Sequence, residues 1–370
     1  MSRPEIEHRY NSDLLFLKDD VERVRRCYPA IIHVLDHPEL RAHFKEYDDP
    51  ANSAKRRSLI AGVIAIFLGA FSLIIAAAEP IHARLPDQMW YWLAVVSAVV
   101  GLASLVIGLS GVMFRKSKSA WLCRRLMTER LRQFHFQTLV CRLPEIIASS
   151  AGAPAVQHYL DQRAGWFAQF RRCFDDCQPD ELQKILDSSE TVDFWLHLLP
   201  EKTTNEPVPQ LASQIFVAYR DLRIMHQLGY ANERLRQSKT IVPSSPRSQA
   251  ALFSNASLLC ISALFVIHVV ISVATPFGWR EIVYSHWTHL AAIWIAIGAL
   301  AIRALEEGLK PDREIERYQH YQFAVRAIRD RYDAAKSWHE KIEIMKEMER
   351  LSYDEMCDFL KTHIKARFIL

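Results

Sequence analysis

The sequence predicts an all-α integral membrane protein with four transmembrane helices, arranged as two hairpins, and long cytoplasmic helices. Half of the 370 residues are hydrophobic, as in an ordinary globular protein, but they concentrate in four apolar blocks. These blocks lack Asp, Glu, Lys and Arg, whereas the segments between them are rich in charge. No segment shows the persuasive alternation of apolar and polar residues that is typical of a strand.

The chain carries only a mild positive charge and no cysteine pattern that indicates a metal site. Its formal net charge is +4 and its pI is about 8.6, below the range above about 9 that is typical of nucleic-acid binders. The seven cysteines contain no CxxC pair, and the closest two, Cys173 and Cys177, lack two further zinc ligands nearby. We therefore expect free thiols in a reducing compartment, no metal, no cofactor and no nucleic-acid partner.

Residues 58–114 are predicted to form the first hairpin, after an N-terminal cytoplasmic helical region at 1–57. The 21 residues 58–78 are uncharged, and at about 1.5 Å per residue they can cross a hydrocarbon core of about 30 Å. The second uncharged segment, 90–114, begins with the aromatic run WYW, which favours a membrane–water interface. Because the connection is short, the two helices are expected to pack antiparallel.

Each helix of this hairpin carries a stripe of small residues at heptad spacing. The stripes consist of Gly62, Ala65, Gly69, Ser72 and Ala76 on the first helix, and of Ser97, Gly101, Ser104, Gly108 and Gly111 on the second. Small residues let helix backbones approach closely in a membrane, where van der Waals contact drives helix association. The stripes therefore predict either packing within the hairpin or contacts between subunits around a pore.

Residues 250–303 are predicted to form the second hairpin. Its first segment, 250–275, is uncharged but carries a set of polar residues, namely Ser254, Asn255, Ser257, Ser262, His268 and Ser272. Its second segment, 287–302, is shorter, contains His289 and ends before Arg303. A buried or re-entrant helix is therefore the alternative to a full crossing by this second segment.

His268 lies well inside the apolar segment that contains it. Ionisable residues inside a span are costly and tend to face a bundle interior or water. The imidazole is expected either to hydrogen-bond to a neighbouring helix or, with Ser257, Ser262 and Ser272, to line an aqueous path. A usual pKa of about 6.5 would make conduction through such a path respond to mild acid. His289 and Arg303 are the further polar candidates within the membrane.

The basic residues around the first hairpin predict its orientation. One of them, Arg84, lies in the connection, and six flank the outer ends. The six are Lys55, Arg56, Arg57, Arg115, Lys116 and Lys118. Because basic residues are enriched on the cytoplasmic side, both termini, the 115–249 region and the 304–370 tail are expected on that side of the inner membrane.

The region 115–249 is predicted to contain two long helices, at 119–140 and 210–240, each with a copy of the tetrapeptide ERLR. The first copy, at 129–132, follows one hairpin, and the second, at 233–236, precedes the other. Both copies are interpreted as solvated, salt-bridged roots of helices that continue into the membrane. Neither copy places a general base near a nucleophile, so we do not expect an enzyme.

The 304–370 tail is predicted to be one long amphipathic helix with an interruption near Ser352. Its apolar stripe includes Val325, Ile328 and Tyr332, which are spaced by three and four residues. This stripe is expected to pack on the helices between the hairpins or, alternatively, to form a coiled coil with another subunit.

Two residue patterns beside the hairpins resemble a known family. The pattern W-x-x-x-R-x-x-x-E-R-L-R comprises Trp121, Arg125, Glu129, Arg130, Leu131 and Arg132, and Y-x-x-x-R-x-x-x-Q-x-x-Y comprises Tyr219, Arg223, Gln227 and Tyr230. With the stretch KIEIMKEMERLSYDEM in the tail, they resemble the SLATT superfamily, which overlaps the domain called DUF4231. The likeness covers about residues 51–370, in an arrangement similar to proteins that carry two such hairpins behind a TRPM-like SLOG domain.

This resemblance implies a membrane effector of bacterial conflict systems, which forms pores or disrupts the membrane when a linked nucleotide-sensing component is triggered. The chain contains no Gly-rich phosphate loop of the G-x-G-x-x-G or Walker type, so a sensor is expected to be a separate protein. The expected function is therefore an oligomeric, pore-forming effector, with a non-conducting membrane scaffold as the alternative. An integral-membrane enzyme is less favoured, because His286 with His289, and Glu306 with Glu307, lack the clustering that such chemistry requires.

Overall fold

The computed structural model describes residues 11–79, 86–109, 115–174, 178–187, 209–236, 245–279 and 285–364. Within these ranges the regular elements are helices and no strand occurs. The chain divides into two compact units. Unit 1 contains Met1–Asn52, Ser119–Arg236 and Glu316–Ile364, and unit 2 contains Ser53–Lys118, Gln237–Ile315 and Lys365–Leu370.

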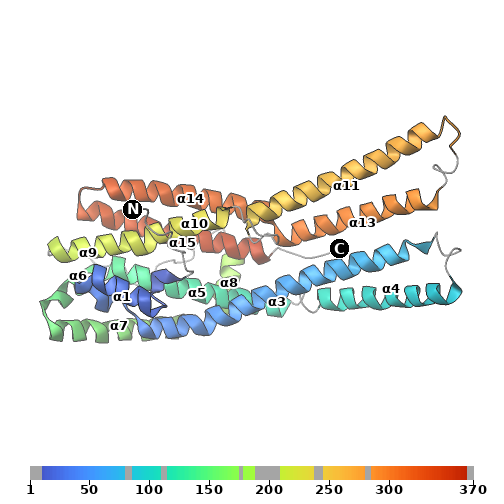
Figure 1. Ribbon diagram of the computed structural model, residues 1–370. Helices are drawn as coiled ribbons and strands as arrows, with labels where there is room; N and C mark the ends of the chain where they lie inside the picture. The colour runs from blue at the N-terminus through green and yellow to red at the C-terminus, as the bar shows by residue number, and fades with distance from the viewer. Residues whose placement is uncertain are drawn as a thin grey trace. The chain divides into compact units, whose positions relative to one another are not determined.

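Four helices in the described ranges are long and apolar enough to cross a membrane, which confirms the predicted fold class. They are α3 (Pro38–Ala76), α4 (Asp87–Gly108), α11 (Pro246–Ala274) and α13 (His286–Leu309) (Figure 1). The last of them has 24 residues, which is longer than the predicted apolar segment because the helix continues through Arg303. It ends at Lys310, whose φ of 48° is left-handed and breaks the helix before α14.

The membrane-type helices of unit 2 lie side by side in the order α11, α13, α3, α4 (Figure 1). Ile66 and Ala70 of α3 pack in one apolar cluster with residues of α13 that include Ile297 and Ala301. The indole Nε1 of Trp294 donates a hydrogen bond of 3.0 Å to the Ile74 carbonyl oxygen. The two hairpins therefore meet through α3 and α13 rather than through their outer helices.

The small-residue stripes of α3 and α4 face each other within the first hairpin. Ser72 Oγ donates to the Ser97 carbonyl oxygen at 2.8 Å, and Ser97 Oγ donates back to the Ser72 carbonyl oxygen at 3.0 Å. A Cβ atom at Gly101 would lie 2.8 Å from Ser72 Oγ, so a larger residue there would displace the Ser72 side chain. Gly108 lies against Ala65, and Gly111 is outside the described residues. Of the two predicted alternatives, the stripes therefore show packing within the hairpin.

Unit 1 is a bundle of helices around α5 (Arg115–Cys141). Every residue from 130 to 141 is buried, which makes the second half of α5 the centre of the bundle. The surrounding helices are α1 (Lys18–Cys27), α2 (Ile32–Leu35), α6 (Leu143–Ala148), α7 (Ala153–Phe174), α8 (Gln178–Asp187), α9 (Pro209–Tyr219), the π-helical η6 (Arg220–Met225), α10 (His226–Leu235), α14 (Pro311–Ala334) and α15 (Trp338–Ile364). The first half of the predicted 210–240 helix thus contains a π-helical interruption.

The tail is two helices, so the prediction of one long helix with a break near Ser352 is wrong. Helix α14 ends at Ala334, and Ser337 caps the start of α15. Glu340 N donates to Ser337 Oγ at 3.1 Å, and Ser337 N donates to Glu340 Oε2 at 3.3 Å. This reciprocal pair is a capping box. Ser352 lies inside α15.

The apolar stripe of the tail belongs to the core of unit 1. Val325, Ile328 and Tyr332 are buried, and the Tyr332 hydroxyl donates to the Phe216 carbonyl oxygen at 2.9 Å. These contacts agree with packing on the helices between the hairpins. The stripe is consequently not available for a coiled coil with another subunit.

The helix α3 contributes residues to both units without a break. Leu40 and Phe44 belong to the core of unit 1, whereas Ile66 and Ala70 belong to the apolar cluster of unit 2. One helix therefore contributes residues to the cores of both units.

Candidate functional site: a buried ionic network

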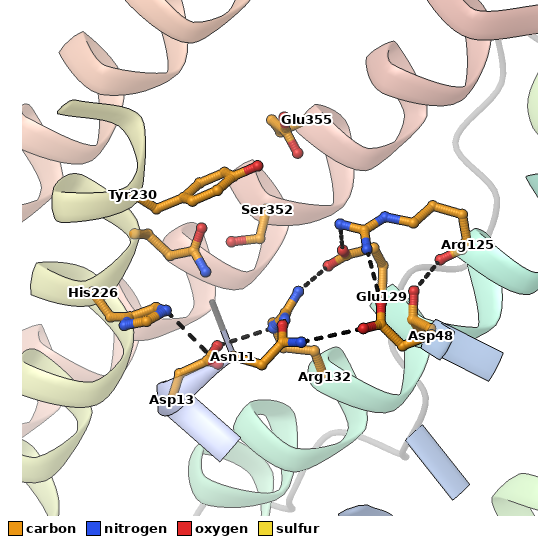
Figure 2. Close-up of polar contacts among 12 residues, drawn as sticks. Asn11, Asp13, Asp48, Arg125, Glu129, Arg132, His226, Tyr230, Ser352 and Glu355 are labelled. Atoms are coloured by element: carbon orange, nitrogen blue, oxygen red, sulfur yellow. Dashed lines mark hydrogen bonds and ion pairs between the residues drawn. The ribbon is translucent and has the colours of Figure 1, made fainter. Parts of the chain in front are cut away.

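The polar residues of unit 1 form a network that joins distant parts of the chain (Figure 2). Asp48 of α3 lies 3.4 Å from Arg125 of α5, which lies 2.5 Å from Glu129. Glu129 lies 2.7 Å from Arg132, whose Nε is 2.9 Å from Asp13 Oδ2. Charges of opposite sign alternate along this row, so each arginine lies between two carboxylates.

The N-terminal segment completes the network from the side of α10. Asn11 accepts a hydrogen bond from Arg132 and donates one of 3.4 Å to Asp48. Ser12 Oγ lies 3.3 Å from His226 Nδ1, and His226 Nε2 lies 3.8 Å from Asp13 Oδ1. Asp13 thus lies between Arg132 of α5 and His226 of α10.

The environment lowers the pKa of two carboxyl groups of the network. Burial by itself would raise the pKa of Asp13, but Arg132 and His226 outweigh it and hold that pKa below its ordinary value. Burial by itself would also raise the pKa of Glu129, but Arg132 and Arg125 outweigh it and lower that pKa. Both groups are therefore ionised at neutral pH and depend on their arginine partners.

A second ion pair lies deeper in the core. Arg223 donates to Glu349 through Nε and one terminal nitrogen, both at 2.9 Å, and the Tyr219 hydroxyl donates to the same carboxylate at 2.8 Å. The side chains of Arg223 and Glu349 are 2% and 0% exposed. Burial alone would lower the pKa of Arg223, but Glu349 raises it well above its ordinary value. Arg223 therefore carries its charge and directs two hydrogen bonds to the Glu349 carboxylate.

The remaining residues of the family-like motif contact the tail. The Tyr321 hydroxyl donates to Gln227 Oε1 at 3.2 Å, and Tyr230 hydrogen-bonds Tyr318 at 3.2 Å. Trp121 makes edge-on ring contacts with aromatic residues of α15. The structure thus brings the two motif patterns of α5 and of α9 to α10 together around α14 and α15.

The two ERLR copies have opposite environments. In the first copy Arg130 is 1% exposed, and its guanidinium lies 4.8 Å from the centre of the Tyr353 ring. In the second copy Glu233 and Arg236 are exposed and lie 3.8 Å apart. The solvated interpretation is therefore wrong for the first copy, because residues 130–141 of α5 are buried, and it agrees with the exposed Glu233 and Arg236 of the second. Helix α10 ends at Leu235, so the second copy is not shown to continue into α11.

Several residues of the network were not singled out from the sequence. Asp13, Asn11 and Asp48 reach the site only through the tertiary fold, so no local pattern indicates them. Glu349 did leave a signal, because it stands among Met345, Met348 and Met356 on the buried side of α15. A carboxylate in such a stripe predicts a buried cation partner.

The polar candidates of the second hairpin do not form one cluster. His268 Nδ1 donates to the Leu264 carbonyl oxygen of its own helix at 2.8 Å, and the ring is exposed. Helical geometry places Ser257 and Ser272 on the same side of α11 as His268, but it places Ser262 on another side. His289 is exposed in the first turn of α13, and Arg303 pairs with Glu306 at 2.8 Å.

The described residues contain no group of three His, Cys, Asp or Glu side chains that could hold a metal ion. The six described cysteines are free thiols, and Cys177 lies outside the described residues. No family model, curated protein or solved structure matches the chain. The fold and the network together define the class: an all-α membrane protein with four helices able to span a bilayer and a helical unit ordered by buried ion pairs.

Proposed function

We propose that the protein is an oligomeric membrane effector of a bacterial, anti-phage type conflict system, which forms a pore or disrupts the membrane under control of its cytoplasmic helices. The resemblance to the SLATT superfamily, overlapping DUF4231, is part of this proposal. Its partners are the lipid bilayer, further copies of the chain and a separate nucleotide-sensing protein. Its location is the inner membrane, with both termini on the cytoplasmic side.

The observation that carries the proposal is the course of α3. Asp48 of this helix belongs to the ionic network, and Ser72 of the same helix belongs to the small-residue contact with α4. We expect a change in the network that moves Asp48 to act on the membrane-type unit through α3, which contains Pro50 two residues after the network residue. The ion pairs of the network share partners, so the loss of one charge weakens its neighbours.

The polar side of α11 supports a conducting role. His268, Ser257 and Ser272 share one side of an otherwise apolar helix, and His268 and Ser272 are exposed in the single chain. Such residues favour water or protein over lipid. In the proposed oligomer this side lines the aqueous path.

One observation favours the alternative, a non-conducting membrane scaffold. The His268 ring is already hydrogen-bonded to the Leu264 carbonyl oxygen, which lowers the cost of a histidine that faces lipid. Conductance therefore separates the two functions.

The test is dye release and single-channel conductance of purified protein in liposomes. Arg132→Gln breaks the network and is expected to raise conductance above that of the unaltered chain. Arg236→Gln is the matched control, because it changes the same position of the exposed ERLR copy and leaves the network intact. Asp48→Asn provides a second network variant if Arg132→Gln fails to fold. Folded, reconstituted network variants that release no dye would overturn the pore and leave the scaffold.

A further inference from the structure

A second side of α11 differs from the side that carries His268. Residues spaced by three, four, three and four form it, and we call this set the outer face of α11: Asn255, Leu258, Ser262, Phe265 and Val269. All five are exposed, with Leu258 at 63% and Phe265 at 69%. The residues of α11 that are buried, Phe253 and Ala274, lie on another side of the helix. The outer face is therefore free in the single chain.

The outer face carries polar groups that lipid cannot satisfy. The Asn255 amide has two donors and an acceptor with two lone pairs, and no hydrogen bond joins it to a described residue. Ser262, one heptad further on, is likewise exposed and lies near the middle of the helix. In hydrocarbon, unsatisfied polar groups are costly, so this face requires either water or protein.

The apolar residues on the same face decide between water and protein. Leu258, Phe265 and Val269 alternate with the two polar residues. A water-lined path would expose these large apolar groups, whereas a helix–helix contact at heptad spacing buries them and pairs the polar groups.

We propose that the outer face of α11 is the contact between two copies of this chain, formed by parallel α11 helices. Copies inserted in the same orientation place their α11 helices parallel, so Asn255 meets Asn255 and Ser262 meets Ser262 at the same depth. The carboxamide is self-complementary, because each copy donates to and accepts from the other. This inference names the subunit contact of the proposed effector and rests on its oligomeric part only, not on conduction.

Disulfide cross-linking in liposomes tests the contact. In a chain whose seven native cysteines are replaced, Ser262→Cys is expected to give a covalent dimer with a lipid-soluble oxidant. Ile261→Cys is the matched control, because its side chain is 60% exposed and at nearly the same depth but lies about 100° round the helix from Ser262, on the side that carries His268. Dimer from Ser262→Cys alone supports the contact. Equal dimer from both variants, dimer from neither, or dimer from Ile261→Cys alone overturns it.

A substitution at Asn255 tests the hydrogen-bonding part of the inference. Asn255→Leu is expected to weaken self-association about 3- to 30-fold, as measured by energy transfer between labelled copies on dilution with lipid. Asn255→Gln, which keeps the amide, should retain more of the association. Unchanged association of Asn255→Leu would overturn the amide pairing and would point to lipid-facing residues.

The two proposals fail separately. Cross-linking through Ser262→Cys without conductance keeps the contact and removes the pore. Conductance without that cross-link keeps the pore and removes the contact.

Discussion

The Arg223–Glu349 pair shows how single residues order unit 1. Both side chains are buried, and they make two hydrogen bonds of 2.9 Å. Removal of one partner of a buried pair leaves an uncompensated charge, which costs far more than the intact pair contributes. The pair therefore makes the position of α15 specific, because no other register of that helix neutralises Arg223.

Glu349→Gln should lower the free energy of unfolding by about 3–5 kcal/mol, because it leaves the Arg223 cation without its counter-charge. Glu347→Gln is the matched control, since the Arg331–Glu347 pair lies on the surface, and it should change the free energy by at most about 1 kcal/mol. Denaturant unfolding of the detergent-solubilised chain measures both. Equal losses for the two variants would contradict the assignment.

Asp13 should make the stability depend on acid. Its pKa is lowered in the folded state, so the folded chain binds fewer protons than the unfolded chain near pH 4. The contribution is therefore present above the ordinary Asp pKa of about 3.9 and is lost as the pH falls through the lowered value. Melting temperatures between about pH 7 and pH 2 should fall for the unaltered chain in this window. Asp13→Asn should melt lower at pH 7 and lose less on acidification, whereas exposed Asp19→Asn should follow the unaltered chain.

At the level of elements, the sequence predicted the membrane-type helices better than the helices of unit 1. Uncharged runs and heptad-spaced small residues are local signals, and they indicated the α3–α4 contact. The end of the helix before α15 also has a local signal, the S-x-x-E capping box from Ser337 to Glu340. The regular spacing of apolar residues, which continues from α14 into α15, concealed this signal. The burial of α5 has no local cause, because it depends on α14 and α15, which return to cover it from far along the chain.

Gly101→Ala should destabilise the first hairpin, whereas Gly108→Ala should not. A Cβ atom at Gly101 would lie 2.8 Å from Ser72 Oγ, but at Gly108 the nearest atom is an ordinary 3.8 Å away. Because Ser72 is held by hydrogen bonds to Ser97, overpacking at Gly101 should cost about 1–3 kcal/mol. Thermal unfolding in mild detergent compares the variants, and an unchanged midpoint for Gly101→Ala would refute the close contact.

At the scale of the whole molecule, the division into two units follows from the sequence only in part. The charged segments between the apolar runs predicted separate cytoplasmic regions, but no pattern in the sequence indicated that three of them share one core. Long-range pairs such as Tyr28 with Asp221, at 2.6 Å, tie these regions together. They depend on the complete fold and so leave no pattern in a short window.

The topology prediction is tested on the whole chain. Arg56, Arg57 and Arg247 are exposed near the starts of the apolar parts of α3 and α11, and Arg84 lies outside the described residues. In a cysteine-free background, Arg236→Cys should react with an impermeant maleimide only after the cytoplasmic side is opened, and Glu79→Cys should react in intact cells. The reverse pattern would invert the orientation.

The long sequence separation within the Arg223–Glu349 pair has a consequence for synthesis of the protein. Glu349 leaves the ribosome 126 residues after Arg223, and the second apolar hairpin is translated between them. At about 5–20 residues per second, Arg223 waits several seconds or more for its counter-charge. The Arg223–Glu349 pair therefore cannot form until both apolar hairpins have been translated, so α15 is the last helix to join the core of unit 1.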